Sequence, residues 1–140
     1  MTTFYEYLYK YSLHDCVVDD IKIINNNIIF QFESGIYELS SLGEQKNLTP
    51  SCEMLVSVEN LNYEKTWEYI DIKMILKGKV VDIDFSQFST LVHKYKWDLD
   101  VHFCSRFCNT ILLKGYASKY YFELSISDID KIEFLFKSND

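Results

Sequence analysis

Two pairs of residues in this sequence carry side chains that could do chemistry. His14 and Asp15 are adjacent, and His102 and Cys104 are separated by one residue. A histidine beside a carboxylate could form a general base with its orienting group, or part of a metal site. A His-x-Cys pair could bind zinc or copper, because both ions accept imidazole nitrogen and thiolate sulfur as ligands. The surrounding residues decide between these chemistries and a structural role.

His14 and Asp15 stand where a short N-terminal segment meets a predicted β-hairpin. Adjacent side chains on an extended backbone point to opposite faces, so these two cannot contact each other if they lie on one strand. We therefore expect one of them to bond backbone amides at the turn and the other to be solvated. Both residues are kept as candidate binding residues, although a structural role is favoured.

His102 and Cys104 fall on the same face of a predicted strand, and Arg106 and Cys108 follow in phase. No Cys-x-x-Cys motif is present to complete a four-ligand zinc site. Cys104 has the neighbours that could stabilise a thiolate, yet no nucleophile-elbow or oxyanion-hole motif accompanies it. We therefore expect a partly buried face where thiols pack, with no catalytic residue and no cofactor. His102 and Cys104 remain the alternative metal ligands.

The hydrophobic pattern predicts a mainly β fold of the α+β class. Apolar and polar residues alternate over short segments, for example 17–24, 67–76 and 120–126, and Asn or Gly residues separate several of them. Apolar residues at helical spacing predict one helix over residues 3–11 and a second over residues 86–96.

These elements predict one domain spanning residues 1–140. We expect an antiparallel β-sandwich or a partly open barrel of about eight or nine short strands, since strands and helices do not alternate regularly. The two helices would cover an end or an edge. Residues 40–51, which contain Gly43 and the single proline, are expected to form the longest loop.

Charge and hydropathy exclude several classes of partner. The chain of 140 residues has a formal net charge of −7, whereas nucleic acids and anionic membranes require a basic face. No run of about 18 apolar residues is present, so no membrane span is expected. The N-terminus lacks the basic and apolar regions of a signal peptide, which predicts a cytoplasmic protein whose four cysteines are reduced.

Aromatic residues are the remaining indication of function. The chain holds 11 Tyr, 10 Phe and 2 Trp, more rings than one small core can bury. Trp67, Tyr69 and Tyr120 are therefore candidate binding residues on an exposed aromatic surface. Exposed Tyr and Trp side chains with Asp and Glu around them are typical of protein-binding faces.

The opening of the chain resembles a loose group of small bacterial proteins. The resemblance covers residues 4–39: a short helix, the turn Leu13-His14-Asp15 and a hairpin that ends in Phe32-Glu33-Ser34-Gly35. Some members of this group resemble immunity proteins encoded beside polymorphic toxins. The resemblance implies a β-rich fold and a toxin-neutralising role, and it assigns no catalytic residue.

Three functions remain open at this point. The first is a non-enzymatic protein-binding domain, specifically an immunity protein whose acidic surface attracts a basic toxin. The second is a small-ligand- or metal-dependent enzyme that uses His14, Asp15, His102 and Cys104. The third is a structural or homo-oligomeric domain, and no oligomeric state follows from the sequence.

Overall fold

The computed structural model describes residues 10–58, 69–105 and 109–137. Thirteen strands and one helix are present in these ranges, and the strands form three antiparallel sheets that do not close into a barrel. The predicted mainly β, antiparallel fold is confirmed. No helix in these ranges is long and apolar enough to cross a membrane.

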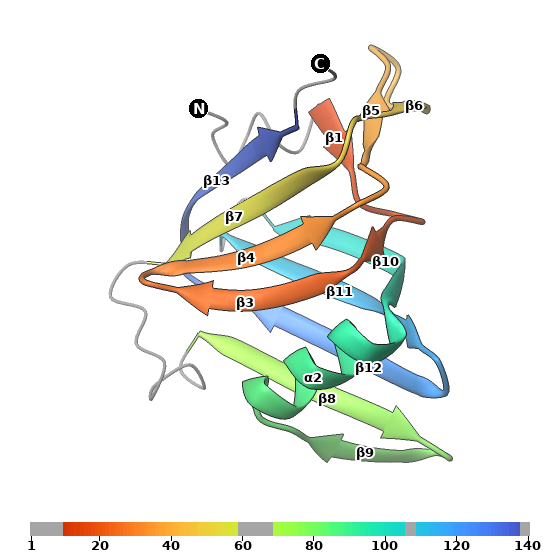
Figure 1. Ribbon diagram of the computed structural model, residues 1–140, viewed down its shortest axis with the longest axis vertical. Coiled ribbons are helices and arrows are strands. Elements are labelled where there is room, and N and C mark those ends of the chain that lie inside the picture. The colour runs from red at the N-terminus through yellow and green to blue at the C-terminus, as the bar shows by residue number, and fades with distance from the viewer. Residues whose placement is uncertain (1–9, 59–68, 106–108, 138–140) are drawn as a thin grey trace.

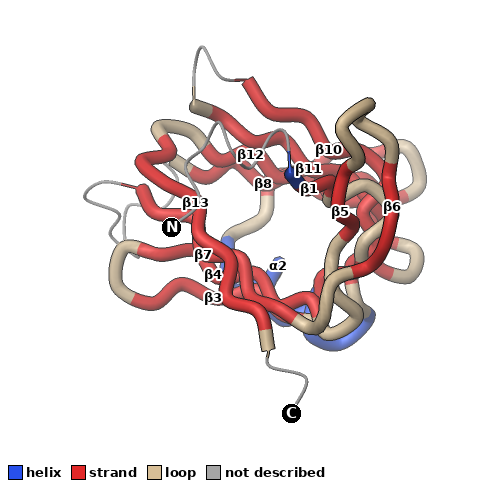
Figure 2. Tube along the Cα trace, turned by 90° about the horizontal axis from the view of Figure 1, so that it is seen from above, coloured by secondary structure: helices blue, strands red, loops and turns tan. Residues whose placement is uncertain are grey.

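Two of the sheets are large and enclose the core. The six-stranded sheet has the order β2 (Val17–Val18), β10 (Trp97–Ser105), β11 (Thr110–Ala117), β12 (Tyr120–Ile126), β8 (Ile70–Leu76), β9 (Lys79–Asp82). The four-stranded sheet has the order β13 (Ile129–Phe136), β7 (Cys52–Val58), β4 (Asn27–Phe32), β3 (Asp20–Ile24). The smaller, three-stranded sheet has the order β1 (Tyr11–Ser12), β5 (Tyr37–Leu39), β6 (Gln45–Leu48). Viewed from above, the two large sheets lie on opposite sides of the core (Figure 2).

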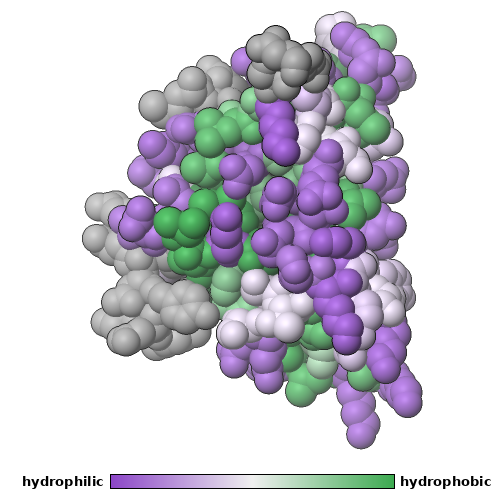
Figure 3. All heavy atoms as spheres, viewed as in Figure 1, coloured by the Kyte–Doolittle hydropathy of each residue, from purple (hydrophilic) through white to green (hydrophobic). Residues whose placement is uncertain are grey.

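The core forms because alternate residues of the large sheets point inward. Phe30 and Met54 from the four-stranded sheet are fully buried, as are Leu113 and Phe122 from the six-stranded sheet. Burying a large apolar side chain contributes about 1.5–3 kcal/mol, so these inward rows supply the main driving force for folding. Hydrophilic side chains occupy much of the surface, with apolar ones between them near β8 and β9 (Figure 3).

The helix α2 (Phe85–Tyr95) confirms the predicted second helix. The Asp84 carboxylate accepts a hydrogen bond of 2.8 Å from the Gln87 amide and so caps the first turn. The helix lies between β3 of one large sheet and β8 and β9 of the other (Figure 1). Phe88 is fully buried, and the Ser89 hydroxyl donates a 2.7 Å hydrogen bond to the Ile21 carbonyl on β3. The helix therefore covers the edge of the four-stranded sheet, which would otherwise expose an unpaired strand.

The predicted strand over residues 17–24 is divided between the two large sheets. β2 pairs with β10, whereas β3 pairs with β4, and the chain changes sheets at Asp19. Asp19 is nearly buried, and its carboxylate accepts a 2.7 Å hydrogen bond from the Glu33 amide. This bond satisfies a backbone donor at the corner, where no ladder partner is available.

Other predictions are corrected or fall outside the described residues. Within the predicted loop over residues 40–51, β6 pairs with β5, so part of this segment is a strand. This strand, the division at Asp19 and the two-residue β1 raise the number of strands above the eight or nine expected. The predicted helix over residues 3–11 lies mostly outside the described residues, and its last residue, Tyr11, belongs to β1.

A β-bulge in β10 determines which residues of that strand face the core. The pairing with β11 shifts register between Leu99 and Val101, and Gly115 lies opposite the shift. A Cβ atom at Gly115 would lie 2.0 Å from the Asp98 carbonyl oxygen, so only glycine fits there. The Trp97 indole Nε1–H donates a 3.0 Å hydrogen bond to the Gly115 carbonyl, which fixes the two strands at the bulge.

We expect Gly115→Ala to destabilise the protein by about 3 kcal/mol or more, because the new methyl group overlaps backbone atoms that cannot move aside. The matched control is Gly78→Ala in the β8–β9 turn, where φ is +78° and the space around the position is open. That control should cost about 1–2 kcal/mol from backbone strain alone. Urea unfolding of both variants measures the difference, and equal losses would contradict the role of the close approach.

Candidate functional site

His14 and Asp15 lie in the turn between β1 and β2, with their side chains in contact. Asp15 has φ of +66°, and its amide donates a 2.8 Å hydrogen bond to the Leu99 carbonyl on β10. His14 Nδ1 lies 3.1 Å from Asp15 Oδ2, and both side chains are at least half exposed. The opposite-faces argument applied to residues on one strand and does not hold here, because residues 14 and 15 lie in a turn. The two side chains contact each other, where a bond from one of them to backbone amides was expected.

The bulge in β10 turns His102 and Cys104 toward the inside of the sheet. Trp97 and Leu99 before the bulge are fully buried, and after the bulge the inward positions pass to the even-numbered residues. His102 and Cys104 are accordingly half-buried, and His102 Nε2 lies 3.2 Å from Cys104 Sγ. The predicted shared, partly buried face is confirmed for this pair, while residues 106–108, including Arg106 and Cys108, lie outside the described residues.

The structure brings the two predicted clusters together through one long-range contact. The Leu13 amide donates a 3.4 Å hydrogen bond to His102 Nδ1 across 89 residues of sequence. Burial and, to a smaller extent, the nearby His14 together lower the pKa of His102 to about 4. His102 is therefore neutral at pH 7.

The protonation of His102 decides what the cluster can do chemically. Because Nδ1 accepts a hydrogen bond from a backbone amide, the single proton of the neutral ring is on Nε2. Nε2 therefore donates toward Cys104 Sγ and cannot take a proton from that thiol. A Cys–His nucleophile needs the opposite arrangement, with a ring lone pair directed at the sulfur. This arrangement favours a structural role for His102.

The other thiols and potential ligands do not build a reactive centre in the described residues. Burial raises the pKa of Cys16 and of Cys52 to about 11, so both remain thiols at pH 7. Across the ranges that the structure describes, no group of three or more His, Cys, Asp or Glu side chains is placed to hold a metal ion. The residues of the alternative enzyme hypothesis are thus close together, but within the described residues they do not form a group of three potential metal ligands.

The two described aromatic candidates, Tyr69 and Tyr120, do not lie together. Trp67 lies outside the described residues, and Tyr69 is partly buried against the core. Tyr120 is the first residue of β12 and Ile126 is the last. Ile126 pairs with Ile70, which directly follows Tyr69 in the sequence. Tyr69 and Tyr120 are therefore separated by the length of β12, about 20 Å at 3.3 Å per residue.

The outward side of the six-stranded sheet presents a surface that single residues did not reveal. We call it the outer face and define it by three cross-strand rows. The first row is Val80, Ile75, Tyr121 and Tyr116; the second is Asp82, Lys73, Glu123, Lys114 and Val101; the third is Asp71, Ser125, Leu112 and Phe103. Residues directly opposite on neighbouring strands have adjacent side chains on one face, so each row is continuous across the sheet.

Three large apolar side chains of the outer face are more than half exposed. The exposed fraction is 61% for Val80, 56% for Tyr116 and 59% for Phe103. The Tyr116 and Tyr121 rings contact each other with centroids 4.7 Å apart. In the middle row, Lys73 Nζ lies 3.0 Å from Asp82 and Lys114 Nζ lies 3.6 Å from Glu123, so these charges are paired within the row.

The sequence carried one signal for this surface. The alternation in residues 110–126 makes Leu112, Tyr116 and Tyr121 members of one face, opposite the buried Leu113 and Phe122. Phe103 carried no such signal, because an unbroken alternation would place it on the same face as Trp97 and Leu99. The bulge reverses that assignment.

Comparison with known proteins supplies no relative: no family model, no curated protein and no solved structure matches this chain.

We expect the stability of the protein to depend on pH through His102. The ring binds a proton near pH 6.5 in the unfolded chain but only near pH 4 in the folded protein. The unfolded state therefore binds more protons between these values, and the free energy of unfolding should rise with pH from 4 to 6.5 by up to about 1.4 kcal/mol per unit.

Urea unfolding at pH 4.5, 5.5 and 7 measures this effect. His102→Gln should flatten the profile, since glutamine can still accept the Leu13 amide but does not titrate. His93→Gln makes the same change at an exposed position on α2 and controls for the loss of an imidazole as such. The same slope in the wild type and the His102 variant would show that the imidazole is not buried in its neutral form.

Proposed function

We propose that this chain is a non-enzymatic protein-binding domain that docks its partner on the outer face of the six-stranded sheet. The observation that carries the proposal is that Tyr116, Phe103 and Val80 are exposed on the same face of one sheet. Exposed apolar patches are uncommon on monomeric proteins unless they bind something. Tyr and Phe are also enriched at the centres of protein interfaces.

The arrangement of the rows supports a specific docking geometry. Tyr116 and Tyr121 pack against each other, so a partner would meet a rigid aromatic pair with little rotational entropy left to lose. The charged side chains of the middle row are paired with each other. A partner could therefore cover them, and exclude water around the two tyrosines, without burying an unpaired charge.

Charge complementarity favours a basic partner. The outer face continues beside Tyr116 into Asp98, its cross-strand partner, and Asp100, both exposed. Burial is the main cause of the raised pKa of the Tyr121 phenol, and the nearby Asp100 carboxylate is the second cause. An acidic rim on a chain of net charge −7 would accelerate encounter with a positively charged surface.

The partner that fits this chemistry and the resemblance of residues 4–39 is a basic toxin. The proposed role is then that of an immunity protein, which acts in the cytoplasm and holds the toxin inactive. The enzyme alternative has less support, because His102 is neutral and donates toward Cys104.

The gene neighbourhood is the first test, and the proposal expects a large secreted toxin-like gene upstream of the gene for this chain. Co-expression with the toxin domain of that gene is the second test. The wild type should bind the toxin domain and restore growth. The double variant Tyr116→Ala/Phe103→Ala should raise Kd by at least about thirtyfold, the effect of losing about 2 kcal/mol at an interface anchor, and should reduce rescue.

The matched control is Leu42→Ala/Leu135→Ala, which shortens two side chains that are 85% and 50% exposed but lie outside the outer face. It should bind and rescue like the wild type. Equal binding by both double variants would place the interface elsewhere, and a wild type that does not bind the toxin domain would refute the immunity role.

A further inference from the structure

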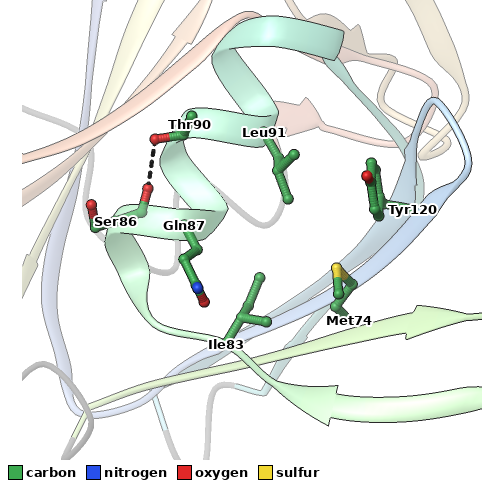
Figure 4. A pocket seen from close by; sticks show the side chains of 7 residues that line it. All are labelled: Met74, Ile83, Ser86, Gln87, Thr90, Leu91 and Tyr120. Carbon is green, nitrogen blue, oxygen red and sulfur yellow. Dashed lines mark hydrogen bonds between the residues drawn. The ribbon is translucent and has the colours of Figure 1, made fainter.

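A groove lies between α2 and the inward side of the six-stranded sheet, on the opposite side of the sheet from the outer face. Its volume is about 480 Å³, within the usual range for small-molecule sites. Met74, Ile83, Leu91 and Tyr120 supply its apolar lining, and Gln87 and Thr90 lie at the helix side (Figure 4).

The groove exists because only one side of α2 packs into the core. Phe88 and Val92 are fully buried in the core. Gln87, Leu91 and Lys94 follow at helical spacing on the neighbouring stripe, which projects over β8 and β9. Side chains from these strands fill only part of the space beneath that stripe.

Two lysines lie near the tyrosine end of the groove. Lys94 is one turn beyond Leu91 on the same helix stripe, and its Nζ lies 5.1 Å from the centroid of the Tyr95 ring. Lys119 Nζ lies 5.5 Å from the centroid of the Tyr120 ring, and the two tyrosine rings are 5.8 Å apart. Two exposed ammonium groups therefore lie around the rings of Tyr95 and Tyr120, just outside the groove residues, on a protein of net charge −7.

We propose that this groove binds an aliphatic carboxylate, with the carboxylate at Lys94 and Lys119 and the alkyl chain along Leu91, Met74 and Ile83. The distance along the helix from Ser86 to Lys94 is about 12 Å, from eight residues at 1.5 Å each. An extended chain advances about 3.6 Å for every three bonds, so a chain of about ten carbons fits that length. Saturated fatty acids of this length combine one negative charge with an apolar chain, and they match both parts of the groove.

Isothermal titration calorimetry with monomeric decanoate at pH 7.5 tests the proposal. Binding should be saturable at one molecule per chain. Affinity should rise from hexanoate to decanoate by up to about fourfold per methylene, because each added group is buried against the groove lining. Leu91→Glu should abolish binding, since it places a carboxylate in the apolar section.

The charged end is tested separately. Lys94→Glu/Lys119→Glu should weaken decanoate binding by about tenfold or more and change decanol binding by less than about twofold. Lys46→Glu/Lys137→Glu makes the same change in net charge at exposed positions away from the groove, and it should leave decanoate binding unchanged. Both lysine pairs are exposed, so these variants carry the test even if Leu91→Glu does not fold.

Three results would overturn the proposal: no saturable decanoate binding by the wild type, equal losses in the two lysine double variants, or undiminished binding by a folded Leu91→Glu variant. The outcome is independent of the proposed function. Tyr116 and Phe103 face the opposite side of the sheet, so their variants should bind decanoate like the wild type.

Discussion

The ring of Phe88 meets Trp97 and Phe122 edge-on, with centroids 5.2 and 5.0 Å apart, and this contact positions the helix on which the rest of the structure depends. Such edge-to-face contacts add to the burial of three large rings, all of which are fully inaccessible to solvent. From this anchor, α2 reaches β3 through Ser89 and covers the edge of the four-stranded sheet. On its other side, the same placement leaves the groove over β8 and β9.

Trp97 connects this aromatic cluster to the bulge in β10. Its indole donates to the Gly115 carbonyl, and Gly115 gives the close approach that the bulge requires. The bulge has two consequences of opposite kind. It turns His102 inward, where burial keeps the ring neutral, and it turns Phe103 outward, where the ring becomes part of the outer face.

The two proposed surfaces are made by the same strands. Met74 and Tyr120 line the groove, while Ile75 and Tyr121, their neighbours in sequence, belong to the outer face. Because successive side chains of a strand point to opposite sides, a six-stranded sheet covered on one side by a helix offers two chemically distinct surfaces. The outer face is broad and rimmed by carboxylates, and it suits a macromolecule. The groove is lined mainly by apolar side chains and has two lysines near one end, which suits the small anion that we propose.

The local pattern of the sequence was sufficient for the elements that depend on local interactions. The helical spacing of apolar residues over 86–96 identified α2, and the alternation within residues 67–76 indicated the strand that the structure shows as β8. Both features arise from neighbours within four residues, so a short window contains the information. The β-rich class followed from the same patterns.

Only the tertiary structure decided where those elements pair and which side chains meet. Asp19 divides one apolar run between two sheets, because β10 and β4, far apart in sequence, each offer a ladder to one half of it. The contact between Leu13 and His102 spans 89 residues, and the reversal of faces in β10 depends on Gly115 in the next strand. By itself, the sequence determined the class of fold and the local faces of its elements. The positions of His14, His102 and Phe103 were decided by strand partners, because the register between distant strands depends on how their buried faces pack together.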